Sequence, residues 1–213
     1  MKNQNKKRAF TLIEISIVLV IIGIILASVM KGRDLIKSSQ IKEFNQVFVT
    51  QWETIANSYF SRMAAVLADT TENGGTEVSI DGFMDGAIDT PTEYAAVKLA
   101  LRNSGIDLDE LIKSDLDDPF KRSVDGEFVG KKAVEVTFTN YILNGKQKNY
   151  LLFTNIPGDV AQAIDTIKDG SASGLKGSVV ALPSEQTAGD EINGTIEDWD
   201  VSTTQAMAIS LSH

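Results

Sequence analysis

The sequence predicts an α+β fold, in which a long amino-terminal α-helix packs on a small antiparallel β-sheet domain and spans a membrane with its first half. Two observations predict the helix: residues 10–30 contain a single charged side chain, Glu14, and no proline precedes Pro91. A third predicts the sheet. Residues 133–143 alternate apolar and polar side chains, and an Asn-Gly turn separates them from a second apolar run at 149–156.

The long helix has two parts with different patterns. Residues 10–30 would extend roughly 30 Å as a helix, at about 1.5 Å per residue, which is enough to cross a bilayer. Beyond Lys31, apolar positions recur mostly at steps of three and four up to Leu67, with Val47 or Phe48 in the stripe. We therefore expect one helix from Phe10 to Leu67, apolar all round at first and on one face later.

The rest of the chain alternates short helices and strands. A polar, glycine-rich connection is expected at residues 69–89, with a short strand near 78–80. Thr90 can cap a helix that begins at Pro91. The expected order is then helix 91–102, helix 107–113, strands 133–143 and 149–156, helix 158–165, strand 178–182, a loop at 184–194, and a strand within 199–211.

Charge sets the orientation of the chain in a membrane and narrows its possible partners. The formal net charge is −9, and loss of the four leader cations Lys2, Lys6, Lys7 and Arg8 would lower it by four, to −13. Basic residues before a membrane helix stay in the cytoplasm, so the chain after Lys31 is expected on the outer side. An acidic outer domain argues against nucleic-acid binding through a basic surface.

The order of signals at the amino terminus is specific. The run Lys6-Lys7-Arg8-Ala9-Phe10-Thr11-Leu12-Ile13-Glu14 leads directly into the apolar segment, and no small-residue cleavage site follows that segment. This order resembles the class III signal of type IV pilins and type II secretion pseudopilins. The resemblance implies cleavage by prepilin peptidase between Ala9 and Phe10, and N-methylation of Phe10. The family usually has Gly where this chain has Ala9.

Glu14 is the residue for which the resemblance implies a role in assembly. A carboxylate in hydrocarbon needs a cation, and cleavage would create one at the Phe10 amine. Within one helix the two groups are awkwardly placed, but neighbouring subunits can pair them. The family resemblance implies that this pairing guides each subunit into a growing filament.

The resemblance also implies a domain scheme, a set of partners and a location. The scheme is a leader at 1–9, a transmembrane and filament-core helix at 10–30, its amphipathic continuation at 31–67, and an exported α+β domain at 68–213. The implied partners are prepilin peptidase, other pilin or pseudopilin subunits, and an inner-membrane platform with its ATPase. The subunit would sit in the inner membrane with a periplasmic domain, and then in a pilus or pseudopilus.

Two further features bear on the kind of subunit. Residues 156–180 weakly resemble a late segment of pseudopilin-like proteins, in which a short helix with Ile164-Asp165 leads through an acidic glycine turn to a strand. The chain has no cysteine, so it cannot close the carboxy-terminal disulfide loop of many type IV pilins. That favours a pseudopilin or a less typical pilin.

No pattern predicts catalysis, a cofactor or a metal. The single histidine is His213, and there is no cysteine, phosphate-binding loop or dinucleotide fingerprint. Asp115, Asp117 and Asp118, and likewise Asp165 and Asp169, are expected to be solvated acidic surface, with a structural calcium site as the alternative. The alternative hypothesis is a periplasmic binding module or enzyme, tethered by one span, that never assembles.

Overall fold

The computed structural model describes residues 12–76, 80–84, 91–143, 145–182, 192 and 198–212. The chain divides into two units, Met1–Gln40 and Ile41–His213, and each is considered by itself. Helix α1 runs from Leu12 to Phe44, a π-helical segment η1 covers Asn45–Val49, and helix α2 covers Thr50–Met63. The unit from Ile41 on contains helices and an antiparallel sheet, which confirms the predicted α+β class and its pilin-like order of elements.

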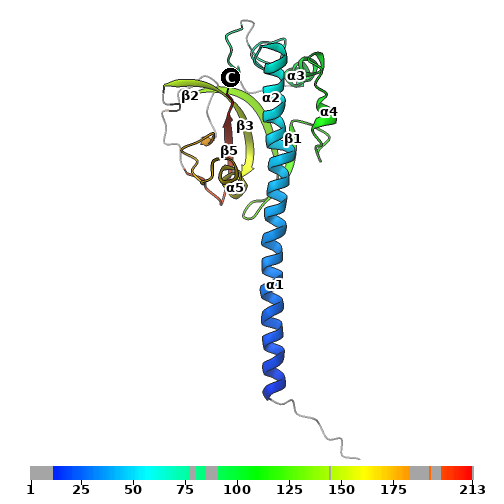
Figure 1. Cartoon of the computed structure of the whole chain (residues 1–213), viewed down its shortest axis with the longest axis vertical. Helices are drawn as coiled ribbons and strands as arrows, with labels where there is room; N and C mark the ends of the chain where they lie inside the picture. The colour runs from blue at the N-terminus through cyan, green and yellow to red at the C-terminus, as the bar shows by residue number, and fades with distance from the viewer. Residues whose placement is uncertain are drawn as a thin grey trace, which may run out of the picture. The chain divides into compact units, whose positions relative to one another are not determined.

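The sheet has five antiparallel strands in the order β1-β2-β3-β5-β4 (Figure 1). Their bounds are β1 Lys121–Gly126, β2 Gly130–Leu143, β3 Lys146–Pro157, β4 Val179–Leu182 and β5 Thr204–Ser210. The predicted hairpin of β2 and β3 is therefore present, with longer strands than the pattern indicated. Strand β1 was not predicted. Its sequence, KRSVDG, lacks the alternation of apolar and polar residues that marks a half-buried strand.

Three further helices complete the fold: α3 Pro91–Asn103, α4 Leu108–Leu111 and α5 Gly158–Asp169. All three were predicted, with small differences in length. Asp107 caps α4, because its carboxylate accepts a hydrogen bond from the backbone N–H of Asp109 at 3.1 Å. Two expected features, the Thr90 cap and residues 78–79 of the short strand, lie outside the described residues, and Ile80 is not in a strand.

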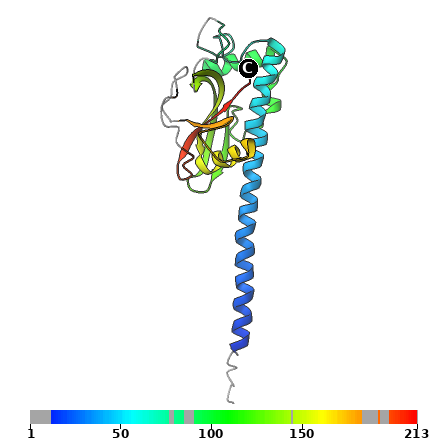
Figure 2. The ribbon, with the colours of Figure 1, turned by 60° about the vertical axis from the view of Figure 1, so that its left-hand side comes forward.

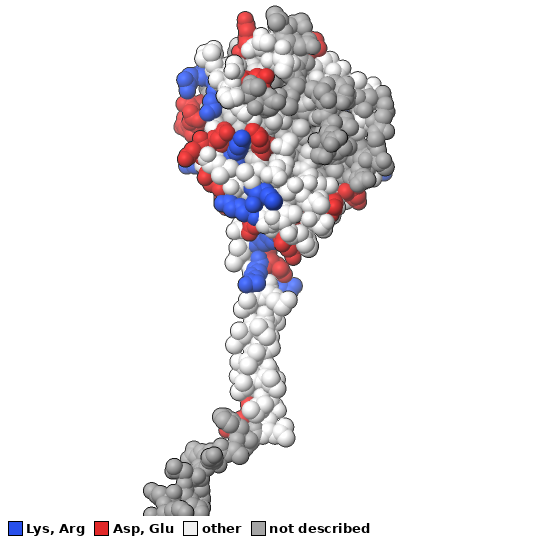
Figure 3. All heavy atoms as spheres, turned by 180° about the vertical axis from the view of Figure 1, so that it is seen from behind, with Lys and Arg blue, Asp and Glu red and all other residues white. Residues whose placement is uncertain are grey.

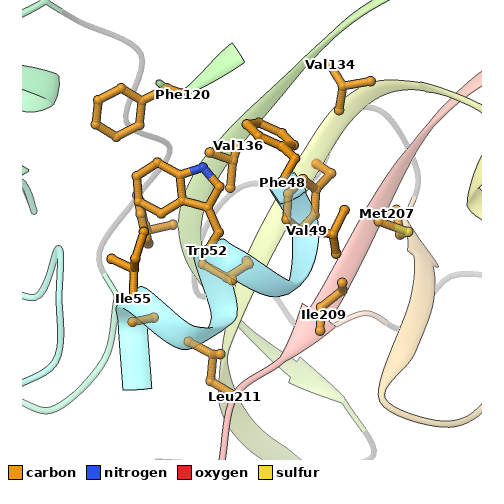
Figure 4. Packing of buried hydrophobic residues seen from close by; sticks show 14 of the residues in the cluster. Phe48, Val49, Trp52, Ile55, Phe120, Val134, Val136, Met207, Ile209 and Leu211 are labelled. Carbon is orange, nitrogen blue, oxygen red and sulfur yellow. The ribbon is translucent and has the colours of Figure 1, made fainter. Parts of the chain in front are cut away.

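The amphipathic helix packs its aromatic stripe against one face of the sheet (Figures 2 and 4). Trp52 is fully buried; its ring stacks on Phe120 at a centroid distance of 5.1 Å and meets Phe138 edge-on at 5.5 Å. A smaller apolar cluster, formed by Tyr141, Tyr150, Leu152, Val180, Leu182, Ile192, Ala206 and Ala208, lies apart from this core. The alternation of side chains along each strand separates the two clusters.

The π-helical segment lies in the part of the helix that packs against the sheet. Phe44, Phe48, Val49 and Trp52 are all buried, and Phe48 contacts Phe44 and Phe153. Phe44, Phe48 and Trp52 follow one another at steps of four, as residues on one helix face do, and Val49 widens the buried stripe. The π-helical turn lies within this buried stretch. Val47 is only half-buried, so the predicted choice between Val47 and Phe48 falls to Phe48.

The helix ends at Met63, before the predicted end at Leu67. Ala64 has a φ of 51°, in the left-handed region, and its N–H bonds to the carbonyl of Phe60 at 2.8 Å. Val66 and Leu67 are buried all the same, from the turn that follows the helix. The spacing of Val66 and Leu67 fits the helical stripe, so the sequence pattern could not distinguish a loop at this place from a continuation of the helix.

The glycine-rich connection is fastened to the sheet through its described residues. Asn149 Oδ1 accepts from the Met84 N–H at 2.9 Å, and Asn149 Nδ2 donates to the Gly82 carbonyl at 3.0 Å. Asn140 Nδ2 donates to the Met84 carbonyl at 2.8 Å. The Asp69 carboxylate accepts from the N–H groups of Asp81 and Gly82, although burial raises its pKa. Two sheet asparagines and one buried aspartate therefore hold this segment.

Candidate functional site

The described part of α1 up to Met30 presents an almost wholly apolar surface. Its large apolar side chains are between 46% and 86% exposed, and Figure 3 shows this helix nearly free of the charged atoms that colour the unit from Ile41 on. Among the described residues, one helix, Leu12–Met63, is long and apolar enough to cross a membrane by length and composition. An apolar surface of this size on a soluble chain would mark an interaction site. Lipid or other apolar helices are the surroundings that could cover such a surface.

Polar groups inside the apolar run are accommodated by the helix itself. Ser16 Oγ donates to the Leu12 carbonyl at 2.8 Å, and Ser28 Oγ donates to the Ile24 carbonyl at 2.9 Å. These bonds satisfy both hydroxyls without a partner helix, as an apolar environment requires. A Cβ at Gly23 or Gly32 would meet no atom within 4 Å, so no close contact within the chain explains either glycine.

Glu14 lies in the first turn of α1 and is the only charged residue between Phe10 and Met30. The amino end of a helix carries partial positive charge, which favours a carboxylate at this place. Phe10, whose amine is predicted to pair with Glu14 after cleavage, lies outside the described residues, as do Ala9 and the basic cluster Lys6, Lys7 and Arg8. The cleavage, methylation and assembly roles of Ala9, Phe10 and Glu14 therefore remain predictions.

The expectation that Asp165 is solvated surface is wrong, because its side chain is 0% exposed. Its Oδ2 accepts from Trp199 Nε1 at 2.8 Å and from the Ser173 N–H at 2.7 Å, while Oδ1 has no hydrogen-bond partner within the described parts of the chain. Burial raises the pKa of Asp165, and the nearby Asp169 carboxylate raises it further, against the lowering effect of these two hydrogen bonds. Asp165 joins α5 to the segment that leads into β5.

Asp169, one turn later on α5, binds the start of β4. It accepts hydrogen bonds from the Ser178 N–H at 2.8 Å, the Val179 N–H at 2.9 Å and Ser178 Oγ at 2.6 Å. Burial acts to raise the pKa of Asp169, but these donors outweigh it and hold the pKa below its usual value. The two carboxyl groups therefore differ in their readiness to ionise, and both serve to fix the loop at residues 170–178.

The acidic cluster of Asp115, Asp117 and Asp118 is more exposed than Asp165, and part of the cluster makes local contacts. Asp115 accepts from the Ser123 N–H at 2.8 Å and pairs with Lys131 Nζ at 3.3 Å, while Asp118 accepts from the Phe120 N–H at 3.0 Å. Desolvation acts to raise the pKa of Asp115, but the Ser123 and Lys131 contacts outweigh it and lower that pKa. Within the described ranges, no three His, Cys, Asp or Glu side chains come together as a metal site.

Sequence reasoning missed the Asp165–Trp199 contact. The spacing of Asp165 and Asp169 places both on one face of a helix, which was readable, but Trp199 follows 34 residues after Asp165. The only signal was a tryptophan in an otherwise polar segment, since a buried indole N–H needs an acceptor.

The amino terminus matches a known family model. Residues 4–30 match the prokaryotic N-terminal methylation motif. No curated protein and no solved structure shows a significant match to the chain. The motif covers the predicted leader, cleavage site and apolar helix together, so the chain carries a prepilin-type signal of the kind that type IV pilins and pseudopilins share.

Proposed function

Starting from a precursor of pilin or pseudopilin type, we propose that the chain is a structural subunit of a filament, either a type IV pilus-like fibre or a type II secretion pseudopilus. The subunit is stored in the inner membrane with its carboxy-terminal unit in the periplasm. Prepilin peptidase removes residues 1–9 and methylates Phe10. An inner-membrane platform and its ATPase then move the subunit into the filament, where its role is mechanical and not catalytic.

The observation that carries this proposal is the match of residues 4–30 to the methylation motif. The helix behind the signal supports it, because its apolar side chains lie exposed all round and can pack against equivalent helices as well as against lipid. Packing of many such helices would bury the whole apolar surface. A plain membrane tether would need an apolar helix of the same length, but it would not need a carboxylate in the first turn of that helix.

The proposed role of Glu14 is electrostatic. On insertion scales, an acidic side chain at the centre of a membrane helix costs about 2.5–3.5 kcal/mol, so such residues are kept where they have a partner. The Phe10 amine becomes available only after cleavage. Cleavage and assembly are thus linked, since the uncut leader lacks that amine and adds four cations.

Processing is tested by mass spectrometry of the mature amino terminus. We expect N-methylated Phe10 in the wild type, and a longer, unprocessed membrane form for Ala9→Leu, because the peptidase requires a small residue before the cut. Asn5→Leu, which lies in the same leader, should be processed normally. Normal accumulation of mature protein from Ala9→Leu would contradict the assigned site, and an intact Met1 in the wild type would favour the tethered module or enzyme.

Assembly is tested by Glu14→Ala in cells that contain the assembly machinery. The variant should insert and be cleaved, but its amount in a sheared or pelleted filament fraction should fall at least tenfold, an outcome that assigns about 1.4 kcal/mol or more to the charge. Ser16→Ala is the matched control, because the Ser16 hydroxyl bonds only to its own helix. Incorporation of Glu14→Ala at the wild-type level would remove Glu14 from the mechanism.

A further inference from the structure

Three lysines surround a pocket at the end of the β2–β3 hairpin. Lys146, Lys148 and Lys176 line a cavity of about 380 Å³, together with the apolar side chains of Leu143, Leu175 and Val180. All three lysines are exposed. The chain as a whole has a formal net charge of −9, so this group of three positive charges is a local exception.

Several other lysines of the same unit, in contrast, pair with a carboxylate. Lys121 pairs with Glu135 at 3.1 Å, Lys131 with Asp115 at 3.3 Å, and Lys168 with Glu53 at 2.6 Å. Within the described part of the chain, no ion pair involves Lys146, Lys148 or Lys176. Three like charges around one cavity attract an anion from outside the unit. The apolar floor favours an anion that also carries an aliphatic group.

A segment that carries both carboxylates and an exposed aliphatic side chain lies on the same unit, at α4 and in the loop after it. Residues 107–118, here called the acidic segment, contain six carboxylates and one lysine, for a net charge of −5. Asp107, Asp115 and Asp118 have the local contacts already described. Asp109, Glu110 and Asp117 are exposed, and none of them forms an ion pair within the described residues. Leu111, next to Glu110, is 42% exposed.

The pocket and the acidic segment face different sides of the unit that begins at Ile41. Figure 1 shows α4 beside α2, whereas the end of β2 and the start of β3 lie on the opposite side of the sheet. One copy cannot bring its own acidic segment into its own pocket. A contact between two copies therefore joins unlike surfaces, and repetition of such a heterologous contact produces a ring where the rotation closes and an open chain, as in a filament, where it does not.

We propose that the lysine pocket binds the acidic segment of a second copy of this chain, with Leu111 against the apolar floor and the Asp109 and Glu110 carboxylates against the lysines. This inference rests on the proposed function, since it names a contact between neighbouring filament subunits. It is separate from the role of Glu14, which concerns the membrane helix. The contact gives each subunit one donor and one acceptor surface outside the membrane.

Disulfide trapping tests the contact directly, because the chain has no cysteine of its own. Leu175→Cys combined with Leu111→Cys should give a ladder of covalent dimers, trimers and larger species from filaments under mild oxidation. Either single variant, and the control pair Leu175→Cys with Phe128→Cys, should stay monomeric; Phe128 is 60% exposed but lies outside the acidic segment. The yield should fall as salt rises, because the contact joins exposed charges.

Charge reversal shows whether the lysines are responsible. Lys148→Glu with Lys176→Glu in the cysteine-pair background should lower the ladder at least tenfold, and a second copy that carries Asp109→Lys and Glu110→Lys should restore a mixed dimer. Filaments that form without any ladder would overturn this contact and leave the filament function intact. A ladder that stops at dimers, a bond within one chain, or a yield unaffected by charge reversal would also overturn it. Absence of filaments in the wild type would count against the function itself.

Discussion

Replacement of Trp52 by alanine should lower the free energy of unfolding of the full chain by about 3–5 kcal/mol, the usual range for a buried tryptophan. Trp52 is 0% exposed and joins the long helix to the sheet domain through Phe120 and Phe138. Its indole N–H also donates to the Pro119 carbonyl at 3.3 Å. Alanine would leave a cavity between the helix and β2 and an unpaired buried carbonyl (Figure 4).

Urea unfolding of the full chain in detergent, followed by far-ultraviolet circular dichroism, measures this loss. Asn57→Ala on the same helix is the control, because Asn57 is exposed and surface substitutions usually change stability by about 0.5 kcal/mol or less. Trp52→Phe should fall between the two, since it keeps an aromatic ring and loses the hydrogen bond. An unfolding midpoint for Trp52→Ala equal to that of Asn57→Ala would contradict the packing described.

Asp169→Asn should destabilise the chain by about 1.5–3 kcal/mol at neutral pH, the range for hydrogen bonds to a charged group. Three donors converge on the Asp169 carboxylate from Ser178 and Val179, and an amide can accept on one side only. The pKa of Asp169 is lowered in the folded state, so its contribution is present above the unfolded value near 3.8 and is lost as pH falls through the folded value. The gap between wild type and variant should therefore close in strong acid.

Asp165→Asn is the matched control on the same helix, and its effect on stability at neutral pH is expected to have the opposite sign. The pKa of Asp165 is raised in the folded state, so its contribution is fully present below the unfolded value and is lost as pH rises through the folded value. An amide stays neutral at every pH and still accepts from Trp199. Thermal melts from pH 3 to pH 8 should find Asp165→Asn as stable as wild type, or more stable, at neutral pH. Equal losses for the two variants would contradict the assigned difference between the carboxyl groups.

The sequence could predict the features that depend on neighbours along the chain. The apolar helix, the β2–β3 hairpin, α3, α5 and the α+β class follow from periodicity and turn residues, and the structure confirms them. The signal at residues 4–30 was readable because its meaning depends on the order of residue types and not on the fold. Glu14 was noticeable for the same reason, since one carboxylate in an apolar run needs no structure to identify it.

The missed features depend on contacts between distant parts of the chain. The sequence pattern left Val47 and Phe48 open, because the burial of each depends on the sheet against which the helix packs; the structure buries Phe48 and leaves Val47 half-buried. Asp165 looked like surface because its burial depends on Trp199. The lysine pocket joins Lys146 and Lys148 to Lys176, which a helix and a loop separate in the sequence.

The π-helical segment Asn45–Val49 also decides where this chain can be recombined with others. It belongs with the sheet domain, because Phe48 and Val49 are buried in the core of the unit that begins at Ile41. A chimera joined between Gln40 and Ile41 would keep that adapter with the domain it fits, whereas a junction after Val49 would exchange it for a foreign turn. The exchangeable module of this protein thus begins inside the helix, well beyond the apolar run that ends at Met30.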